Sequence, residues 1–256
     1  MATDPLTYVY CVVAAKRRPA LARSRKGLPG TGRVRLLDVD AGLFAAVADA
    51  PRIRYGEAAI RRGLADLEWV SRAAVGHERV VESFIGERAV LPMKLFTIFT
   101  DDARAIDHVR SERARIHTFV KRVANQQEWG VRVTLHRNRV LPTASGAAGG
   151  EVSGAAYLVR KKKHRDAANE LVEHARETVA DLYDRLAARS RLAKRRPAGD
   201  VPAQDGPMLL DAAFLVPRAR STSFRALVVR EARALSRSGY GLTISGPWPP
   251  YTFVQD

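Results

Sequence analysis

The sequence contains a single cysteine, Cys11, so the chain cannot form an internal disulfide or a thiolate metal cluster. It also lacks long apolar runs. The longest, Ala89 to Thr100, includes Lys94 and is shorter than the roughly 20 residues that cross a bilayer. A basic segment followed by an apolar stretch and a small-residue cleavage site, typical of secretory signals, is absent from the first residues. We therefore expect a cytoplasmic protein with no membrane contact, and Cys11 as a small core residue.

Acidic residues are scarce relative to basic ones: 27 Asp and Glu face 43 Lys and Arg, for a formal net charge of +16. Of the cations, 35 are Arg and 8 are Lys, in a chain also rich in Ala, which indicates a general compositional bias as much as selection for phosphate binding. Such a charge attracts acidic surfaces of any class and carries little specificity. The charge alone therefore does not favour nucleic acid as the partner.

Catalytic motifs are missing. No G-x-x-x-x-G-K-[ST] sequence occurs, and Gly27–Gly32 lacks the G-x-G-x-x-G order, so we interpret it as a loop. His77-Glu78 begins like a zinc-protease helix, but no second His follows one turn later. No Ser or Cys has a locally identifiable base. We predict a protein that is not an enzyme and has no catalytic residue, cofactor or metal.

Composition suggests where the chain divides. Residues 141–150 are small, flexible and uncharged, which is typical of an interdomain linker. We expect one domain over residues 1–140 and another over 151–256, with a proline-containing loop at 195–202 inside the second.

Hydrophobic periodicity predicts alternating strands and helices in both domains. In the first, the expected strands are 8–13, 34–39, 43–48, 90–99 and 129–136, and the expected helical regions are 57–86 and 106–123. Gly76 is a possible break in the earlier helical region, whose apolar residues are Ile60, Leu64, Leu67, Val70, Ala74, Val81 and Phe84. Asp101 and Asp102 stand where acids cap a helix.

The second domain is expected to contain strands 152–159, 208–216 and 240–245 and helices 161–189 and 223–238. In the first of these helices, apolar residues recur every three or four positions, as in a heptad. This order predicts an α+β protein of two ferredoxin-like domains, each a mostly antiparallel sheet covered by helices. A ferredoxin-like sheet is also the RRM fold, so a basic RNA-binding protein is the alternative function. Strand 93–99 has two aromatic residues, but not the RRM pattern.

Three features are candidates for contacts or structural roles. The segment Ser245–Phe253 combines three prolines with Trp248, Tyr251 and Phe253, and such a stiff segment either caps its own domain or docks on another chain. The basic run of Lys161, Lys162 and Lys163 is either a solvated helix start or a contact for an acidic partner. His77 lies on the apolar face of its helix, which favours a hydrogen-bonded core or interdomain histidine over a ligand.

Five sequence blocks carry a resemblance to a known family. They are Tyr8–Val13, His77-Glu78 with the strand Val90–Lys94, Glu128–Val133, Ala156–Lys161 and Gly246–Val254. In these blocks the chain resembles the gas vesicle protein F/L family, and Pro92, Trp129 and Tyr157 join His77 as candidate structural residues. One departure is Lys94-Leu95-Phe96-Thr97, where many relatives read Arg-Phe-Gly-Thr.

The resemblance implies a non-enzymatic role in building gas vesicles. Members of the family associate with the small hydrophobic shell protein as minor components or assembly factors, and their first domain is a modified ferredoxin-like fold. We expect the partners to be the shell protein and other gas vesicle accessory proteins, with the chain in the cytoplasm and at the gas vesicle. The helix 161–189 and residues 248–253 are the expected contacts.

Overall fold

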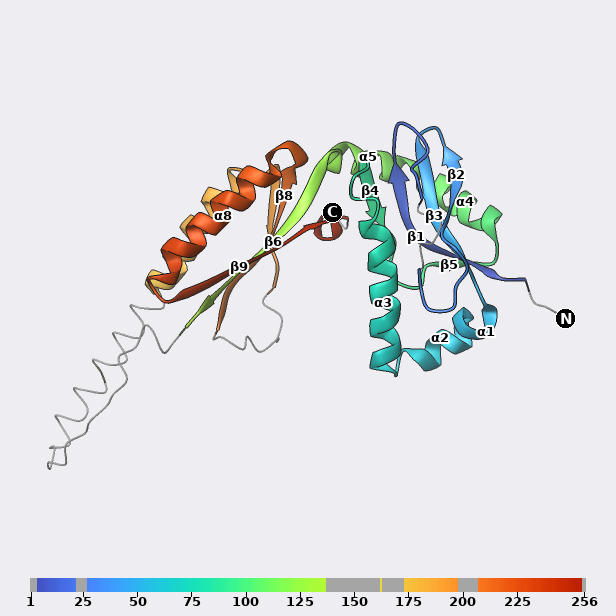
Figure 1. Cartoon of the computed structure of the whole chain (residues 1–256), viewed down its shortest axis with the longest axis horizontal. Helices are drawn as coiled ribbons and strands as arrows, with labels where there is room; N and C mark the ends of the chain where they lie inside the picture. The colour runs from blue at the N-terminus through green and yellow to red at the C-terminus, as the bar shows by residue number, and fades with distance from the viewer. Residues whose placement is uncertain (1–3, 22–26, 137–161, 163–172, 198–206, 255–256) are drawn as a thin grey trace, which may run out of the picture. The chain divides into compact units, whose positions relative to one another are not determined.

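The computed structural model describes residues 4–21, 27–136, 162, 173–197 and 207–254. They belong to two compact units (Figure 1). Unit 1 comprises Met1–Glu128 together with Pro247–Asp256, and unit 2 comprises Trp129–Gly246. Each unit has one sheet covered by helices, which confirms the predicted α+β class.

The sheet of unit 1 is built around a fully buried central strand. Every residue of β1 is buried, Cys11 included, because the strand is an almost unbroken apolar run. All described pairings are antiparallel. In spatial order the strands are β2 (Arg35–Asp40), β3 (Leu43–Ala50), β1 (Leu6–Ala14) and β4 (Ala89–Pro92), with β5 (Ile98–Phe99) also paired to β1. The predicted hairpin is confirmed, and Gly42 supplies its positive φ of 73°.

The helices of unit 1 begin and end differently from the prediction. They are α1 (Arg52–Tyr55), α2 (Glu57–Gly63), α3 (Leu67–Glu82), α4 (Asp102–Ser111) and α5 (Arg113–Val123). The break in the long helical region falls before α3, where the Asp66 carboxylate accepts the Trp69 N–H. The prediction of a break at Gly76 is wrong, because Gly76 lies inside α3. Leu64 and Leu67 are exposed rather than part of the buried face.

The predicted strand 90–99 is two short strands, because the chain turns between them. Phe96 has a φ of 65°, a left-handed conformation that residues with a Cβ adopt at a cost. The predicted cap after this turn is confirmed: the Asp101 carboxylate accepts the Arg104 N–H at the start of α4.

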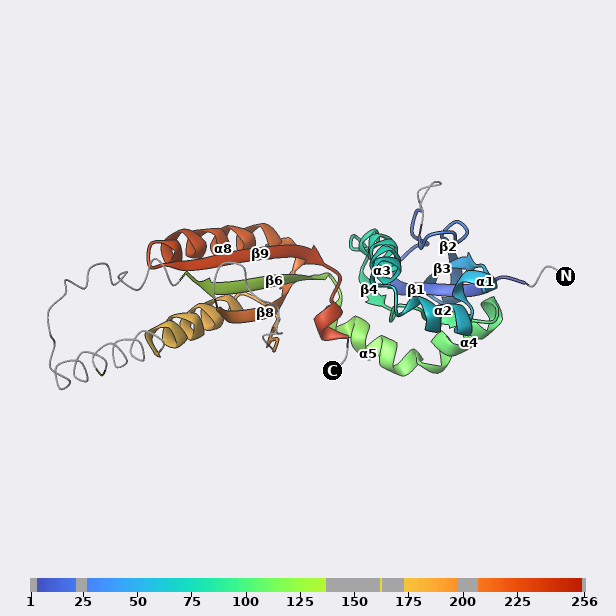
Figure 2. The same cartoon turned by 90° about the horizontal axis from the view of Figure 1, so that it is seen from below.

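In its described residues, unit 2 has a four-stranded sheet with two helices along it (Figure 2). Its strands, in spatial order, are β7 (Leu192–Arg195), β8 (Met208–Pro217), β6 (Gln126–Leu135) and β9 (Tyr240–Trp248). The helices are residues 173–187 and α8 (Ser221–Ser236). The described part of the heptad helix buries the residues predicted to face the core, which are Ala175, Val179, Leu182 and Leu186. Strand β7 was not predicted.

The two units do not follow the boundaries expected from composition. Strand β6, expected to close the first domain, is hydrogen-bonded in the sheet of unit 2, whereas the segment after Gly246 belongs to unit 1. Composition marks loops, but it does not encode which sheet a strand joins, because that choice depends on distant residues. The expected linker 141–150 and strand 152–159 lie outside the described residues.

Candidate interaction surfaces

The C-terminal segment Pro247–Val254, here called the arm, is tied into unit 1. The buried Glu128 carboxylate, whose residue is 3% exposed, accepts the Thr252 N–H at 2.8 Å and the Thr252 hydroxyl at 2.6 Å. The Arg122 guanidinium donates to the Phe253 carbonyl oxygen. These charge-assisted hydrogen bonds hold the arm against the domain that begins the chain.

The three aromatic side chains of the arm, predicted as contacts, differ in exposure. Phe253 is 2% exposed, and Tyr251 packs against the core of unit 1. Trp248 is half-buried. Burial raises the pKa of the Tyr251 phenol above its usual range, and the nearby Glu78 carboxylate adds to the shift. The pKa of Glu78 is also raised, mainly by burial and to a smaller extent by the charge of Glu82.

His77 and Tyr8 form a buried polar pair in the same core. The Tyr8 oxygen lies 2.7 Å from Nδ1 of His77 and accepts the Phe96 N–H at 3.2 Å. The tautomer of the imidazole decides which of these two atoms donates. Burial lowers the pKa of His77 to about 4, and the facing Met93 backbone opposes the shift only in part. The imidazole is therefore neutral at pH 7.

A loop, residues 27–33, is anchored to the same core by its backbone. The Tyr10 oxygen accepts the Leu28 N–H at 3.0 Å, and the Tyr55 hydroxyl donates to the Pro29 carbonyl at 2.7 Å. The predicted loop is therefore held at several points by buried tyrosines, which pre-forms its shape.

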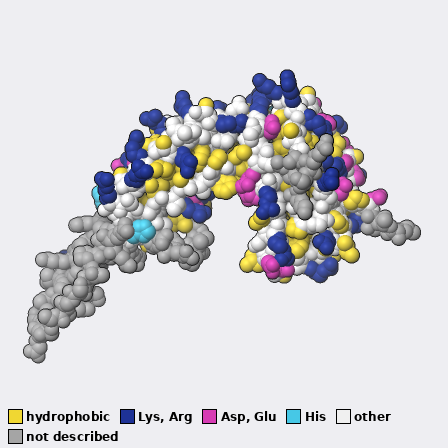
Figure 3. Space-filling view, viewed as in Figure 1, with side chains coloured by type: hydrophobic (Ala, Val, Ile, Leu, Met, Phe, Trp, Pro, Cys, Tyr) yellow, Lys and Arg dark blue, Asp and Glu magenta, His cyan; other side chains and the backbone are white. Residues whose placement is uncertain are grey.

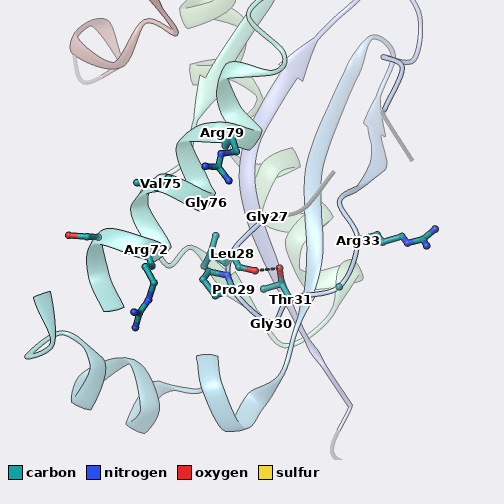
Figure 4. Close-up of a pocket in the computed structure, with 12 residues that line it drawn as sticks. Gly27, Leu28, Pro29, Gly30, Thr31, Arg33, Arg72, Val75, Gly76 and Arg79 are labelled. Carbon is teal, nitrogen blue, oxygen red and sulfur yellow. Dashed lines mark hydrogen bonds between the residues drawn. The ribbon is translucent and has the colours of Figure 1, made fainter. Parts of the chain in front are cut away.

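The loop packs directly on α3 at Gly76. A Cβ at this position would lie 2.8 Å from the Gly27 carbonyl oxygen, so the approach requires glycine. Between the loop and the exposed side of α3 is a groove of about 830 Å³, here called the α3 groove (Figure 4). Its lining residues are Gly27, Leu28, Pro29, Gly30, Thr31, Gly32, Arg33, Ser71, Arg72, Val75, Gly76 and Arg79.

The first three helices of unit 1 also expose large apolar side chains. Ile53 is 85% exposed, Leu64 58%, Leu67 80% and Val75 54%. Figure 3 shows hydrophobic and basic side chains mixed on the face of unit 1 that this view presents. Exposed apolar groups that share neighbouring elements are typical of a surface that binds another protein.

The aromatic residues that could stack on RNA are engaged inside unit 1. The Phe96 ring stacks on Trp69, with centroids 5.1 Å apart and planes at 14°. The Phe99 ring packs on His108, with centroids 5.1 Å apart. Both rings of the predicted RRM-like strand therefore already make aromatic contacts within unit 1.

The remaining predicted residues occupy varied positions. Pro92 in β4 lies opposite Cys11 of β1. Trp129 in β6 is 5% exposed and donates its Nε1–H to the Ser221 hydroxyl at 3.3 Å. Lys162 is exposed. Three predicted residues lie outside the described part of the chain: Tyr157, Lys161 and Lys163.

Two other kinds of site are absent from the described ranges. No three His, Cys, Asp or Glu side chains there lie close enough together to hold a metal ion. No helix in that part of the chain combines the length and apolar character needed to cross a membrane.

Comparison with known proteins identifies the family. The model of the gas vesicle synthesis protein GvpL/GvpF family matches residues 6–255. Gas vesicle protein L of Streptomyces sp. (strain CB03234) is 30% identical over 99% of this chain and 94% of its own length. Gas vesicle protein L2 of Halobacterium salinarum is 26% identical over 97% of this chain and 91% of its own length.

Solved structures show the same fold. The crystal structure of the gas vesicle protein GvpF from Anabaena sp. PCC7120 superposes with a TM-score of 0.67, at 16% identity, covering 99% of this chain and 97% of the other. GvpF from Microcystis aeruginosa gives a TM-score of 0.64 at 14% identity, covering 98% of this chain and 99% of the other. With a family match over nearly all its length and a fold shared with GvpF, the chain belongs to the GvpL/GvpF family of gas vesicle proteins.

Proposed function

We propose that this chain is a non-enzymatic accessory protein that binds the hydrophobic shell subunit, or other vesicle proteins, while gas vesicles nucleate and grow. It acts in the cytoplasm and at the gas vesicle. Membership of the GvpL/GvpF family supports a role at the gas vesicle. The observation that supports binding is the exposure of four large apolar side chains of unit 1, which are Ile53, Leu64, Leu67 and Val75.

A physical requirement of the organelle makes such a partner useful. A shell subunit that forms a gas-tight wall exposes apolar surface, and before incorporation this surface promotes aggregation. A folded protein that covers it reversibly keeps the subunit available for assembly. The net charge of +16 keeps such a partner soluble despite its own apolar patch.

Two of the groups with strongly shifted pKa values, His77 and Tyr8, support binding without turnover. His77 and Tyr8 are buried and hydrogen-bonded to each other, so their unusual pKa values result from their place in the core. Neither residue lines the α3 groove. A perturbed group suggests catalysis when it faces a cleft, and these two do not.

The proposal is tested with purified shell subunit. The wild-type chain is expected to suppress light scattering by the diluted subunit and to co-purify with it. The variant Ile53→Ser/Leu67→Ser should lose most of this effect, because it removes exposed apolar area from unit 1. The control Leu192→Ser/Val229→Ser changes two exposed residues of unit 2, 37% and 38% exposed, and should behave like wild type.

Cells provide the second measurement. Deleting the gene in a vesicle-forming host should abolish or stunt vesicles, and the control variant should restore them better than Ile53→Ser/Leu67→Ser. Normal vesicles after deletion, together with unchanged precipitation of the subunit, contradict the proposal.

A further inference from the structure

The α3 groove has rigid walls. One wall is α3, and the other is the loop 27–33, held by Tyr10 and Tyr55 and pressed against Gly76. A groove fixed in this way loses little conformational entropy when a ligand enters, so its contacts contribute efficiently to binding.

The helical wall presents a regular pattern of side chains. Arg72, Val75 and Arg79 are spaced three and four residues apart, so they lie along one face of α3. The two arginines are two helical turns apart, about 10.5 Å along the axis. Figure 4 shows both on α3, Arg79 near Gly76 and Arg72 further along the helix. The wall is thus an apolar centre with a cation at each end.

The cations of this wall are available to an outside anion. Arg79 is exposed and has no acidic partner among the described residues. Arg72 pairs with Glu68 one turn earlier, but both side chains are largely exposed and such a pair contributes little. Arg54 adds charge nearby: a Cβ on Gly30 would lie 2.6 Å from its guanidinium nitrogen.

A partner that complements this wall must combine apolar and acidic groups at matching intervals. An α-helix does so when apolar residues recur at positions i, i+3, i+4 and i+7 and acids flank them. A small anion would satisfy the arginines and leave Val75, which is 54% exposed, uncovered. An extended acidic segment would place its side chains alternately on opposite faces, out of step with the spacing on α3.

We propose that the α3 groove is the binding site for an acidic amphipathic helix of another gas vesicle protein. The source of the helix rests on the proposed function, whereas the specificity for an acidic amphipathic helix rests on the groove itself. Apolar residues of the helix cover Val75, Leu28 and Pro29, and its carboxylates pair with Arg72 and Arg79.

The test uses a fluorescein-labelled synthetic helix of Leu, Ala and Glu with this apolar spacing, titrated with the full chain in a fluorescence anisotropy assay. The variant Val75→Glu/Arg79→Glu should weaken binding at least about tenfold, because it buries a carboxylate and reverses one rim charge. The matched control, Val229→Glu/Arg233→Glu, makes the same changes at the same spacing on exposed positions of α8 in unit 2. It should bind within about twofold of wild type, because it leaves the α3 groove unchanged while it matches the net charge of the test variant.

Two further probes test which property of the peptide the groove recognises. A peptide of identical composition in scrambled order should bind at least about fivefold more weakly, and inorganic phosphate at equal charge concentration should compete poorly. Equal weakening by both double variants, or equal binding of the scrambled peptide, would show attraction to net charge alone and overturn the proposal. Efficient competition by phosphate would also overturn it, in favour of an anion site.

The result is separable from that for the proposed function. If the synthetic helix fails to bind while the chain still suppresses light scattering by the shell subunit, the proposed groove is contradicted and the accessory role is retained. Helix binding that succeeds without any effect on the shell subunit keeps the groove and removes the shell subunit as client. Circular dichroism of both double variants confirms that the comparison is made between folded proteins.

Discussion

The Glu128 carboxylate accepts two hydrogen bonds from Thr252, one from its backbone and one from its side chain, across 124 residues of sequence. We expect Thr252→Ala to lower the free energy of unfolding of unit 1 by about 1.5–3 kcal/mol, because it removes a hydrogen bond to a buried charged group. Urea denaturation followed by tryptophan fluorescence measures the change. The control Thr118→Ala removes an exposed hydroxyl from α5 and should change stability by less than about 0.5 kcal/mol. Equal effects would show that the arm does not stabilise unit 1.

Substitutions at Phe96 should follow an unusual order of stability. Both Phe96→Gly and Phe96→Ala lose the stacking on Trp69, but only glycine relieves the φ of 65°. We expect the glycine variant to be more stable than the alanine variant by about 1 kcal/mol, measured by chemical denaturation. At Phe99 in β5, where φ is not positive, alanine should be the more stable of the two. The same order at both sites would contradict the assigned turn.

Gly76→Ala should destabilise the chain even though alanine is the better helix former. The added Cβ would lie 2.8 Å from the Gly27 carbonyl oxygen and push the loop away from α3. We expect a loss of about 1–2 kcal/mol in thermal or urea unfolding, net of the gain in helix propensity. Gly86→Ala is the control, since nothing lies within 4 Å of a Cβ there, and it should change stability by less than about 0.5 kcal/mol. A stabilised Gly76→Ala variant would disprove the close packing.

His77 should make stability depend on pH. Its pKa is about 4 in the folded chain and near 6.5 when unfolded, so the unfolded state binds more protons between these values. The contribution of His77 to the free energy of unfolding should therefore be fully present above about pH 6.5. As the pH drops toward 4, the free energy of unfolding should fall by up to about 3 kcal/mol. Glu78 has a raised pKa, so it makes stability fall as the pH rises, which is the opposite dependence. Wild type and the variant described next both contain Glu78. His77→Gln should flatten the profile in urea denaturation at pH 4.5, 5.5 and 7, and an unchanged slope would place the dependence elsewhere.

Much of the secondary structure could be predicted because its signal is local. The apolar run of β1, the turn at Gly42 and the heptad residues before Arg189 each depend on neighbours in sequence. The pairing of β6 and the docking of the arm could not be predicted, because each depends on residues more than a hundred positions away. The turn at Phe96 could not be predicted, because its φ of 65° is one that residues with a Cβ rarely adopt.

The candidate surfaces were only partly visible in the sequence. The arm was identified from its prolines and rings, but the α3 groove was missed because the loop 27–33 looked like a simple connection. A signal was present on α3: Val75 is apolar, yet it lies outside the face formed by Ala73, His77 and Val80. An apolar residue that breaks the period of its helix is a reasonable marker of a binding surface.

The arm gives the chain an order of events during its synthesis. Residues that complete unit 1 emerge from the ribosome only after all of Trp129–Gly246 has been translated. Until then Glu128 has no Thr252 to bind. A nascent chain still on the ribosome therefore cannot complete unit 1, the unit with the exposed apolar side chains. Any client binding that needs a complete unit 1 is delayed until unit 2 has been made.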